Sequence, residues 1–229
     1  MKPLAILFDI DGTLITTGGA GAVAWRRAFE ELYGIPADIG QFSDAGMTDP
    51  EVGAKTFAAV IGREPTPREL TRVIATRLKH LPDTVSESEG YRVLDGVEEL
   101  LPQLADEGYL LGVTTGGTDS AAHIKLARAN LGRWFPVGGY GSDSTNRTEL
   151  TKIAIQRCGR MLGMDLDPRR VLVIGDTPLD IAAAHGAHAI GVGVASGHFS
   201  EDKLERAGAD YVLASLRSPL PIASTTSAV

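Results

Sequence analysis

The sequence predicts an α/β protein with a parallel β-sheet core and an all-helical insert after the first strand. Short apolar runs without polar alternation recur along the chain, as expected for strands buried on both faces of a parallel sheet. Amphipathic stretches separate these runs, which is typical of βαβ units. One interval, residues 17–90, contains three helix patterns and no convincing strand.

The first predicted strand is Leu4 to Phe8, an unbroken apolar run that ends in the acids of "FDIDG". Taken alone, Asp11-Gly12 also fits the turn of a hairpin, but a half-exposed hairpin strand would alternate apolar and polar residues. Further strands are predicted at 109–115, 135–141, 170–176, 189–195 and 210–216. The helices between them are predicted at 97–107, 119–131, 149–162, 179–185 and 200–207.

The insert contains the helix patterns "AVAWRRAFEELYG", "TDPEVGAKTFAAVIG" and "TPRELTRVIATRLKHL". Asp49 and Thr66 are predicted N-caps, because each is followed by proline at the first helical position. The glycines near residue 18 and the polar residues 83–90 are the expected linkers. We therefore expect a catalytic core of residues 1–16 and 91–217, a helical cap of residues 17–90, and a frayed tail of residues 218–229.

Composition limits the classes of partner. The net charge of −7 over 229 residues argues against a basic surface for nucleic acid or anionic membranes. No apolar stretch approaches the roughly 18 residues of a membrane span, and the N-terminal run is too short for a signal peptide. Cys158 is the only cysteine, so no internal disulfide can form. We expect a cytoplasmic protein that binds neither nucleic acid nor membrane, and nothing in the sequence indicates its oligomeric state.

Polar residues follow three of the predicted strands. Asp9 and Asp11 follow the first, Thr115 and Gly116 end the second, and Asp176 ends the strand at 170–176. Open α/β sheets bind ligands at the carboxyl ends of their strands, so these groups should meet at one edge. Neighbouring carboxylates repel unless a cation lies between them, and oxygen ligands of this kind suit Mg²⁺. Alone, "GDTPLD" also fits a helix N-cap at Asp176.

The motifs "FDIDGTL", a strand-end Thr followed by Gly, and "VIGDTPLD" resemble those of the haloacid dehalogenase superfamily. The stretches "AGMTDPEV" and "GSDSTNRTEL" resemble its phosphoglycolate-phosphatase-like members. The resemblance implies a Rossmann-like three-layer core with a mobile helical cap. It also implies a Mg²⁺-dependent phosphatase, a phosphoric monoester hydrolase, that acts on a small phosphorylated metabolite similar to phosphoglycolate.

The same resemblance implies roles for the acids. Asp9 would be the nucleophile that forms an aspartyl-phosphate, and Asp11 would protonate the leaving oxygen and then activate water. Mg²⁺ would bind Asp9, the main-chain carbonyl of Asp11, and Asp176. Asp180, one helical turn after Asp176, would lie beside the metal ligands and orient them.

The phosphoryl group would be held by Thr115, Gly116 and Arg147. Thr115 is nearer the strand end than Thr114, which should point to the other face of the sheet. The superfamily commonly has a lysine where this chain has "SDSTNRTELTKIAI", so Arg147 and Lys152 are both candidates for the active-site cation. We favour Arg147, because an arginine can bridge Asp9 and phosphoryl oxygens in a fork.

Two alternative functions share this scaffold. A sugar phosphomutase would pass the same aspartyl-phosphate to a sugar hydroxyl. A catalytically idle phosphate-sensing or partner-binding protein would not need a nucleophile, so the complete set of acids argues against it. The natural substrate depends on the shape of the cap, which the sequence does not define.

Overall fold

The computed structural model describes residues 2–42 and 44–222. Its main sheet has six parallel strands in the order β5-β4-β1-β6-β7-β8. These are β1 (Ala5–Phe8), β4 (Leu110–Thr115), β5 (Val137–Tyr140), β6 (Val171–Gly175), β7 (Ile190–Val194) and β8 (Tyr211–Leu213). The first strand lies between β4 and β6, so its carboxyl end lies at the centre of the sheet edge. The fold is the predicted α/β, Rossmann-like arrangement.

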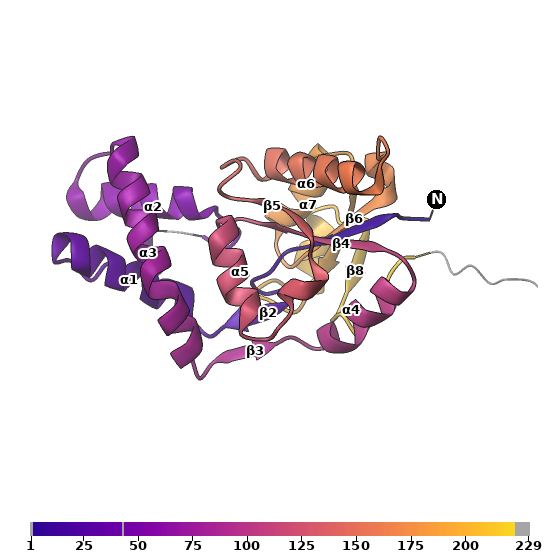
Figure 1. The fold of residues 1–229 in the computed structure, drawn as a ribbon, viewed down its shortest axis with the longest axis horizontal. Helices are drawn as coiled ribbons and strands as arrows, with labels where there is room; N and C mark the ends of the chain where they lie inside the picture. Colours follow the sequence, from indigo (N-terminus) through magenta and orange to yellow (C-terminus); the bar gives the residue numbers. More distant parts are fainter. Residues whose placement is uncertain (1, 43, 223–229) are drawn as a thin grey trace, which may run out of the picture.

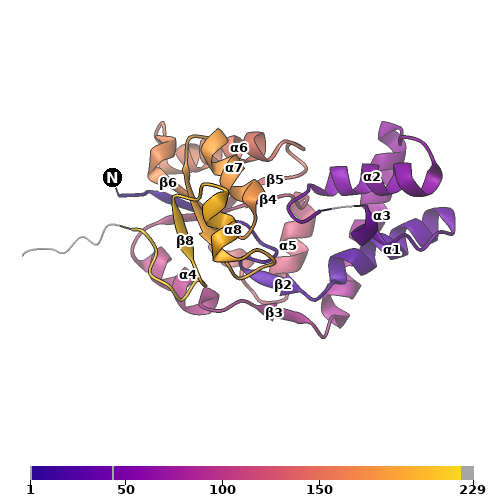
Figure 2. The ribbon, with the colours of Figure 1, turned by 180° about the vertical axis from the view of Figure 1, so that it is seen from behind.

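Helices cover both faces of this sheet. On one face, α4 (Val97–Asp106) and α5 (Asp119–Ala127) pack on alternate residues of the strands, such as Ile6 and Phe8. On the other face, α6 (Arg147–Leu162) and α7 (Pro178–Gly186) pack on Ala5 and Leu7. The last helix, α8 (Glu201–Arg206), packs on β7 and β8. Figure 1 shows the sheet between these layers, and Figure 2 shows it from behind.

Three helices form a group to one side of the sheet, and we call them the cap helices: α1 (Ala20–Tyr33), α2 (Asp49–Ile61) and α3 (Pro67–Glu87). They have their own aromatic core, in which Trp25, Phe29 and Phe57 are buried. A second small cluster joins α1 and α3 to α5 of the sheet layer. Single-turn 3-10 helices cover Ile39–Gln41, Gly132–Trp134 and Pro168–Arg170.

Two short strands connect the cap helices to the sheet. They are β2 (Ile15–Thr17) and β3 (Tyr91–Val93), which form an antiparallel pair. Beyond this pair the two chain segments cross at Gly18 and Gly90, where a Cβ on Gly18 would lie 2.4 Å from the Gly90 backbone. Gly18 also has a φ of +59°, so glycine is required there for two separate reasons.

Several local expectations need correction. Residues 83–87 belong to α3 and are not a linker, because Thr84 and Val85 are buried against neighbouring helices. The N-cap of α2 is Thr48, which forms a capping box with Glu51, and not Asp49. Leu220 of the expected tail is buried in the main core, while residues 223–229 lie outside the described part of the chain. No helix among the described residues is long and apolar enough to cross a membrane.

Candidate active site

A cavity of about 450 Å³ opens at the carboxyl edge of the sheet, between the strand ends and the cap helices. Asp9 and Asp11 follow β1, Thr115 ends β4, and Asp176 follows β6. All four line the cavity, and so does Arg147 from the start of α6. The residues that the sequence singled out therefore meet in one place, although they come from distant parts of the chain.

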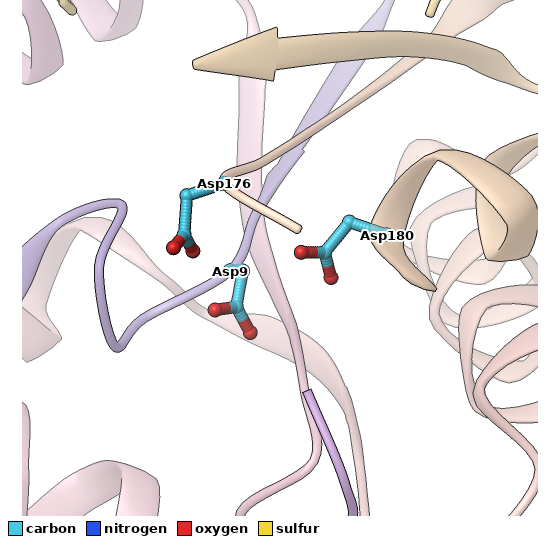
Figure 3. Close-up of side chains that lie close together, drawn as sticks. All are labelled: Asp9, Asp176 and Asp180. Atoms are coloured by element: carbon cyan, nitrogen blue, oxygen red, sulfur yellow. The ribbon is translucent and has the colours of Figure 1, made fainter. Parts of the chain in front are cut away.

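Asp9, Asp176 and Asp180 form a buried acidic cluster, in which one carboxylate oxygen from each residue lies within 4.8 Å of the other two. Figure 3 shows these side chains coming from the ends of β1 and β6 and from α7. Burial, followed by the charge of Asp180, raises the pKa of Asp9 well above its usual value. The same two causes raise the pKa of Asp176 to about 7. The cluster therefore has an excess of buried negative charge.

Arg147 supplies positive charge beside this cluster. It is the first residue of α6, where the Asn146 side chain caps the helix, and only 10% of its side chain is exposed. Its Nη2 lies 3.4 Å from Asp9 Oδ1 and also contacts Asp180 Oδ1. Burial opposes the charge of Arg147, but Asp180 and Asp9 outweigh this effect and raise its pKa above the ordinary value.

Lys152, the alternative cation, lies elsewhere. Its side chain is 42% exposed and its Nζ donates to Glu149 Oε1 at 2.9 Å on the same helix. Of the two candidates, Arg147 alone contacts the acidic cluster.

Asp180 is fixed at the start of α7. Its Oδ2 accepts hydrogen bonds from the backbone N–H and the hydroxyl of Thr177, at 3.1 and 2.7 Å, in a capping box. Thr177, and not Asp176, is therefore the N-cap of this helix. One carboxylate oxygen of Asp180 binds the N-cap residue Thr177 and the other contacts Arg147, so Asp180 orients both the start of α7 and the arginine.

Asp176 has no basic partner among the residues that the structure describes. Its Oδ1 accepts a hydrogen bond from the Thr13 hydroxyl at 3.3 Å. The backbones of Gly12 and Gly197 lie so close that a Cβ on either would fall 2.4 or 1.8 Å from Asp176 Oδ2. The chain thus leaves room around a buried carboxylate that lacks a counter-charge. This donor set of buried carboxylates fits a hard divalent cation.

Asp11 is more open than the other acids, with 42% of its side chain exposed, and its Oδ2 contacts the amine of Lys125. Thr115 is buried, and its Oγ1 accepts a hydrogen bond from the Gly117 N–H at 3.2 Å. Gly116 lies against the cap, because its carbonyl accepts the Asp49 N–H at 2.7 Å. Thr114 lies on the opposite face of β4, where its hydroxyl is 3.1 Å from that of Thr151.

Sequence reasoning missed two features of this cavity. The first is Lys125, which follows the apolar Ala121 by four residues, so helical spacing could have placed both on one face of α5. The second is an ion pair of the cap, in which Arg77 Nη1 lies 2.6 Å from Asp49 Oδ2. That oxygen also accepts the Thr118 N–H at 2.8 Å, so Asp49 joins the cap helices to the loop after β4.

The chain is similar to known proteins in sequence and in fold. A family model for haloacid dehalogenase-like hydrolases matches residues 3–188. The chain is 29% identical over 213 residues to validoxylamine A 7'-phosphate phosphatase of Streptomyces hygroscopicus subsp. limoneus, with 92% of each protein covered. It is 29% identical over 218 residues to phosphoglycolate phosphatase of Rhodospirillum rubrum, covering 90% of this chain and 85% of that protein. A solved structure described as a predicted phosphoglycolate phosphatase from Haemophilus somnus superposes with a TM-score of 0.73 at 18% identity, covering 94% of this chain and 96% of that one.

Proposed function

The chain belongs to the haloacid dehalogenase-like hydrolase family and is a phosphatase of that family, and from this premise we propose that it hydrolyses a small phosphate monoester through a phosphorylated Asp9. One observation carries the proposal. Asp9 lies at the carboxyl end of a central strand, lines the cavity, and is flanked by Arg147 and by the other two acids of the cluster. A carboxylate held in this way can attack phosphorus and be balanced by positive charge.

The proposed reaction has two steps. In the first, an Asp9 oxygen bonds to phosphorus, the bond to the leaving oxygen breaks, and that oxygen takes a proton from the Asp11 carboxyl group. In the second, water attacks the same phosphorus and gives a proton to the Asp11 carboxylate, and the bond to Asp9 breaks. Inorganic phosphate leaves and both acids return to their starting states.

Asp9, Asp176 and the main-chain carbonyl of Asp11 would hold Mg²⁺, and Asp180 would orient this set. A bound Mg²⁺ would supply the positive charge that keeps Asp9 and Asp176 ionised and that offsets charge on the phosphoryl oxygens. Asp176 supports this assignment best: the pKa of Asp176, like that of Asp9, is raised, but Asp176 has no basic partner among the described residues.

Arg147, the Thr115 hydroxyl and the backbone at Gly116 would bind the transferring phosphoryl group. Arg147 already balances Asp9, and its planar fork can also donate to phosphoryl oxygens. These groups would lie where negative charge accumulates during phosphoryl transfer. They would therefore lower the activation barrier and not only bind the substrate.

The cavity supports a small substrate. Its volume of about 450 Å³ must hold the phosphoryl group and the leaving group together. The named relatives act on phosphoglycolate and on validoxylamine A 7'-phosphate, both phosphate monoesters, so we propose a monoester of a small hydroxy compound, with phosphoglycolate as the first candidate.

The test is phosphate release from a panel containing 2-phosphoglycolate, glycerol 3-phosphate, two glucose phosphates and p-nitrophenyl phosphate. We expect Mg²⁺-dependent turnover of at least one alkyl phosphate and inhibition by beryllium fluoride. Asp9→Asn should abolish turnover and keep the fold, whereas Asp106→Asn at the exposed end of α4 should change neither. Substantial activity in folded Asp9→Asn would refute the covalent mechanism. Interconversion of the glucose phosphates without phosphate release would instead identify a mutase.

A further inference from the structure

Lys125 is a buried lysine at the edge of the active-site cavity. It comes from the inner face of α5, and only 8% of its side chain is exposed. Within residues 2–42 and 44–222 its amine contacts one carboxylate, Asp11 Oδ2. Burying an ammonium group is costly unless a partner compensates it, so this single contact accounts for the position of the lysine.

The helix that carries Lys125 is tied to the strand that leads out of the cap. The Tyr91 hydroxyl of β3 donates to the backbone carbonyl of Lys125 at 2.8 Å. One turn later, the Arg128 guanidinium group stacks on the Tyr91 ring, 4.5 Å from its centre, and donates to the Ser88 carbonyl at 2.8 Å. The backbone of Lys125 is therefore held in place, and its amine contacts Asp11.

The two partners differ in exposure. Lys125 is buried, but Asp11 keeps 42% of its side chain exposed and lines the cavity. No other donor among the described residues contacts the Asp11 carboxylate, so its second oxygen, Oδ1, is open. A pair that served only to stabilise the fold would not require one acid oxygen to remain available in the cavity.

An ammonium group donates hydrogen bonds and accepts none. A carboxyl oxygen that faces Lys125 therefore acts as an acceptor, and when Asp11 carries a proton, the proton is on the opposite oxygen. We propose that Lys125 is a positioning residue that makes Asp11 Oδ1 the oxygen that gives the proton to the leaving group and takes it from water. The inference rests on the proposed acid and base role of Asp11.

The test compares two leaving groups. An alkoxide needs a proton as it departs, whereas p-nitrophenolate is stable without one. We expect Lys125→Met to lower kcat/KM for the best alkyl phosphate of the panel about 10- to 100-fold, part of what general acid catalysis contributes, and to lower that for p-nitrophenyl phosphate only a few-fold. Lys125→Arg restores a donor-only cation and should recover most of the loss. Lys79→Met, on an exposed lysine of α3, is the matched control and should have no effect.

The Asp11→Asn background separates the possible causes. If Lys125 acts through Asp11, adding Lys125→Met to Asp11→Asn should lower kcat/KM for the alkyl phosphate by less than about two-fold. The proposal would be overturned if Lys125→Met lowered kcat/KM for the alkyl phosphate as much in the Asp11→Asn background as in the wild type. Equal losses of kcat/KM on both substrates in folded Lys125→Met would also overturn it. In either case the lysine would act on the substrate or on the fold. If Asp11→Asn itself does not discriminate between the leaving groups, the acid role in the proposed function fails, and Lys125 has no proton to position.

Discussion

Asp176→Asn should stabilise the protein in the absence of metal. Burial and the neighbouring Asp180 raise the pKa of Asp176 from 3.8 to about 7. This difference is about 3 pKa units, and each unit corresponds to about 1.4 kcal/mol, so ionised Asp176 destabilises the metal-free fold by about 4 kcal/mol at pH 8. Asparagine has nearly the same size and cannot ionise. For a chain of this length we expect its melting temperature to exceed that of the wild type by roughly 5–15 °C in EDTA.

The same charge determines a pH dependence. In the metal-free wild type the folded state keeps a proton on Asp176 up to about pH 7, whereas the unfolded chain releases it near its ordinary value of 3.8. Between these values the folded state binds more protons, so the free energy of unfolding falls as pH rises. The asparagine variant lacks this contribution. The stability difference between variant and wild type should therefore be smallest near pH 4 and largest above pH 7.

Metal should narrow this difference in stability, and about a thousand-fold excess over its Kd would be needed to cancel it. If Asp176 binds Mg²⁺, the ion stabilises the folded wild type, by about 2.7 kcal/mol at a concentration one hundred times its Kd. The asparagine variant should respond weakly. Thermal melts at several pH values, with EDTA or with Mg²⁺, measure both effects, and Asp106→Asn is the control for a lost surface charge. A variant no more stable than wild type in EDTA at pH 8 would refute the repulsion argument, and an undiminished response to Mg²⁺ would refute the metal assignment.

Two further predictions concern the cation and the chain crossing. Arg147→Met should lower kcat about 10²–10³-fold and Arg147→Lys should recover part of it, whereas Lys152→Met should stay within a few-fold of wild type. Steady-state kinetics at saturating Mg²⁺ measure kcat of these variants. A larger loss of kcat in Lys152→Met than in Arg147→Met would identify Lys152 as the active-site cation. Gly18→Ala and Gly19→Ala both place alanine at positive φ, but only at Gly18 does the new Cβ meet another backbone. We expect Gly18→Ala to lose clearly more stability and more kcat on the alkyl phosphate, and equal losses in melts and kinetics would contradict a role for the close crossing.

The strand and helix order of the core could be predicted because its signals are local. Strands such as β1 and β6 are buried on both faces, so they appear in the sequence as unbroken apolar runs. Their carboxyl ends must lie at the same edge of a parallel sheet, so the sequence alone predicts that Asp9, Asp176 and Thr115 lie close together. Asp180 was expected beside them from the resemblance of "VIGDTPLD" to the superfamily motif.

Other features depend on partners that are distant in the sequence. The strands β2 and β3 have three residues each and pair across more than seventy positions, so neither has a pattern of its own. The end of α3 appears polar, but Thr84 and Val85 are buried by tertiary packing. Asp49 was expected to cap its own helix, yet its carboxylate turns away to Arg77 and to the Thr118 N–H. In each case a contact from elsewhere in the chain overrides the local preference.

Arg147 connects the proposed nucleophile with the cap. Its Nη2 contacts Asp9 and Asp180, while its Nη1 donates to the Gly46 carbonyl, in the loop before α2, at 3.0 Å. That loop lies directly on the loop after β4, since a Cβ on Gly116 would be 2.5 Å from the Met47 carbonyl oxygen. A movement that lifts the cap loop therefore also removes an acceptor from the arginine. The position of this loop and the hydrogen bonding of the arginine beside Asp9 would therefore change together. A lysine has no planar fork with which to make these contacts together, which explains why arginine suits this position.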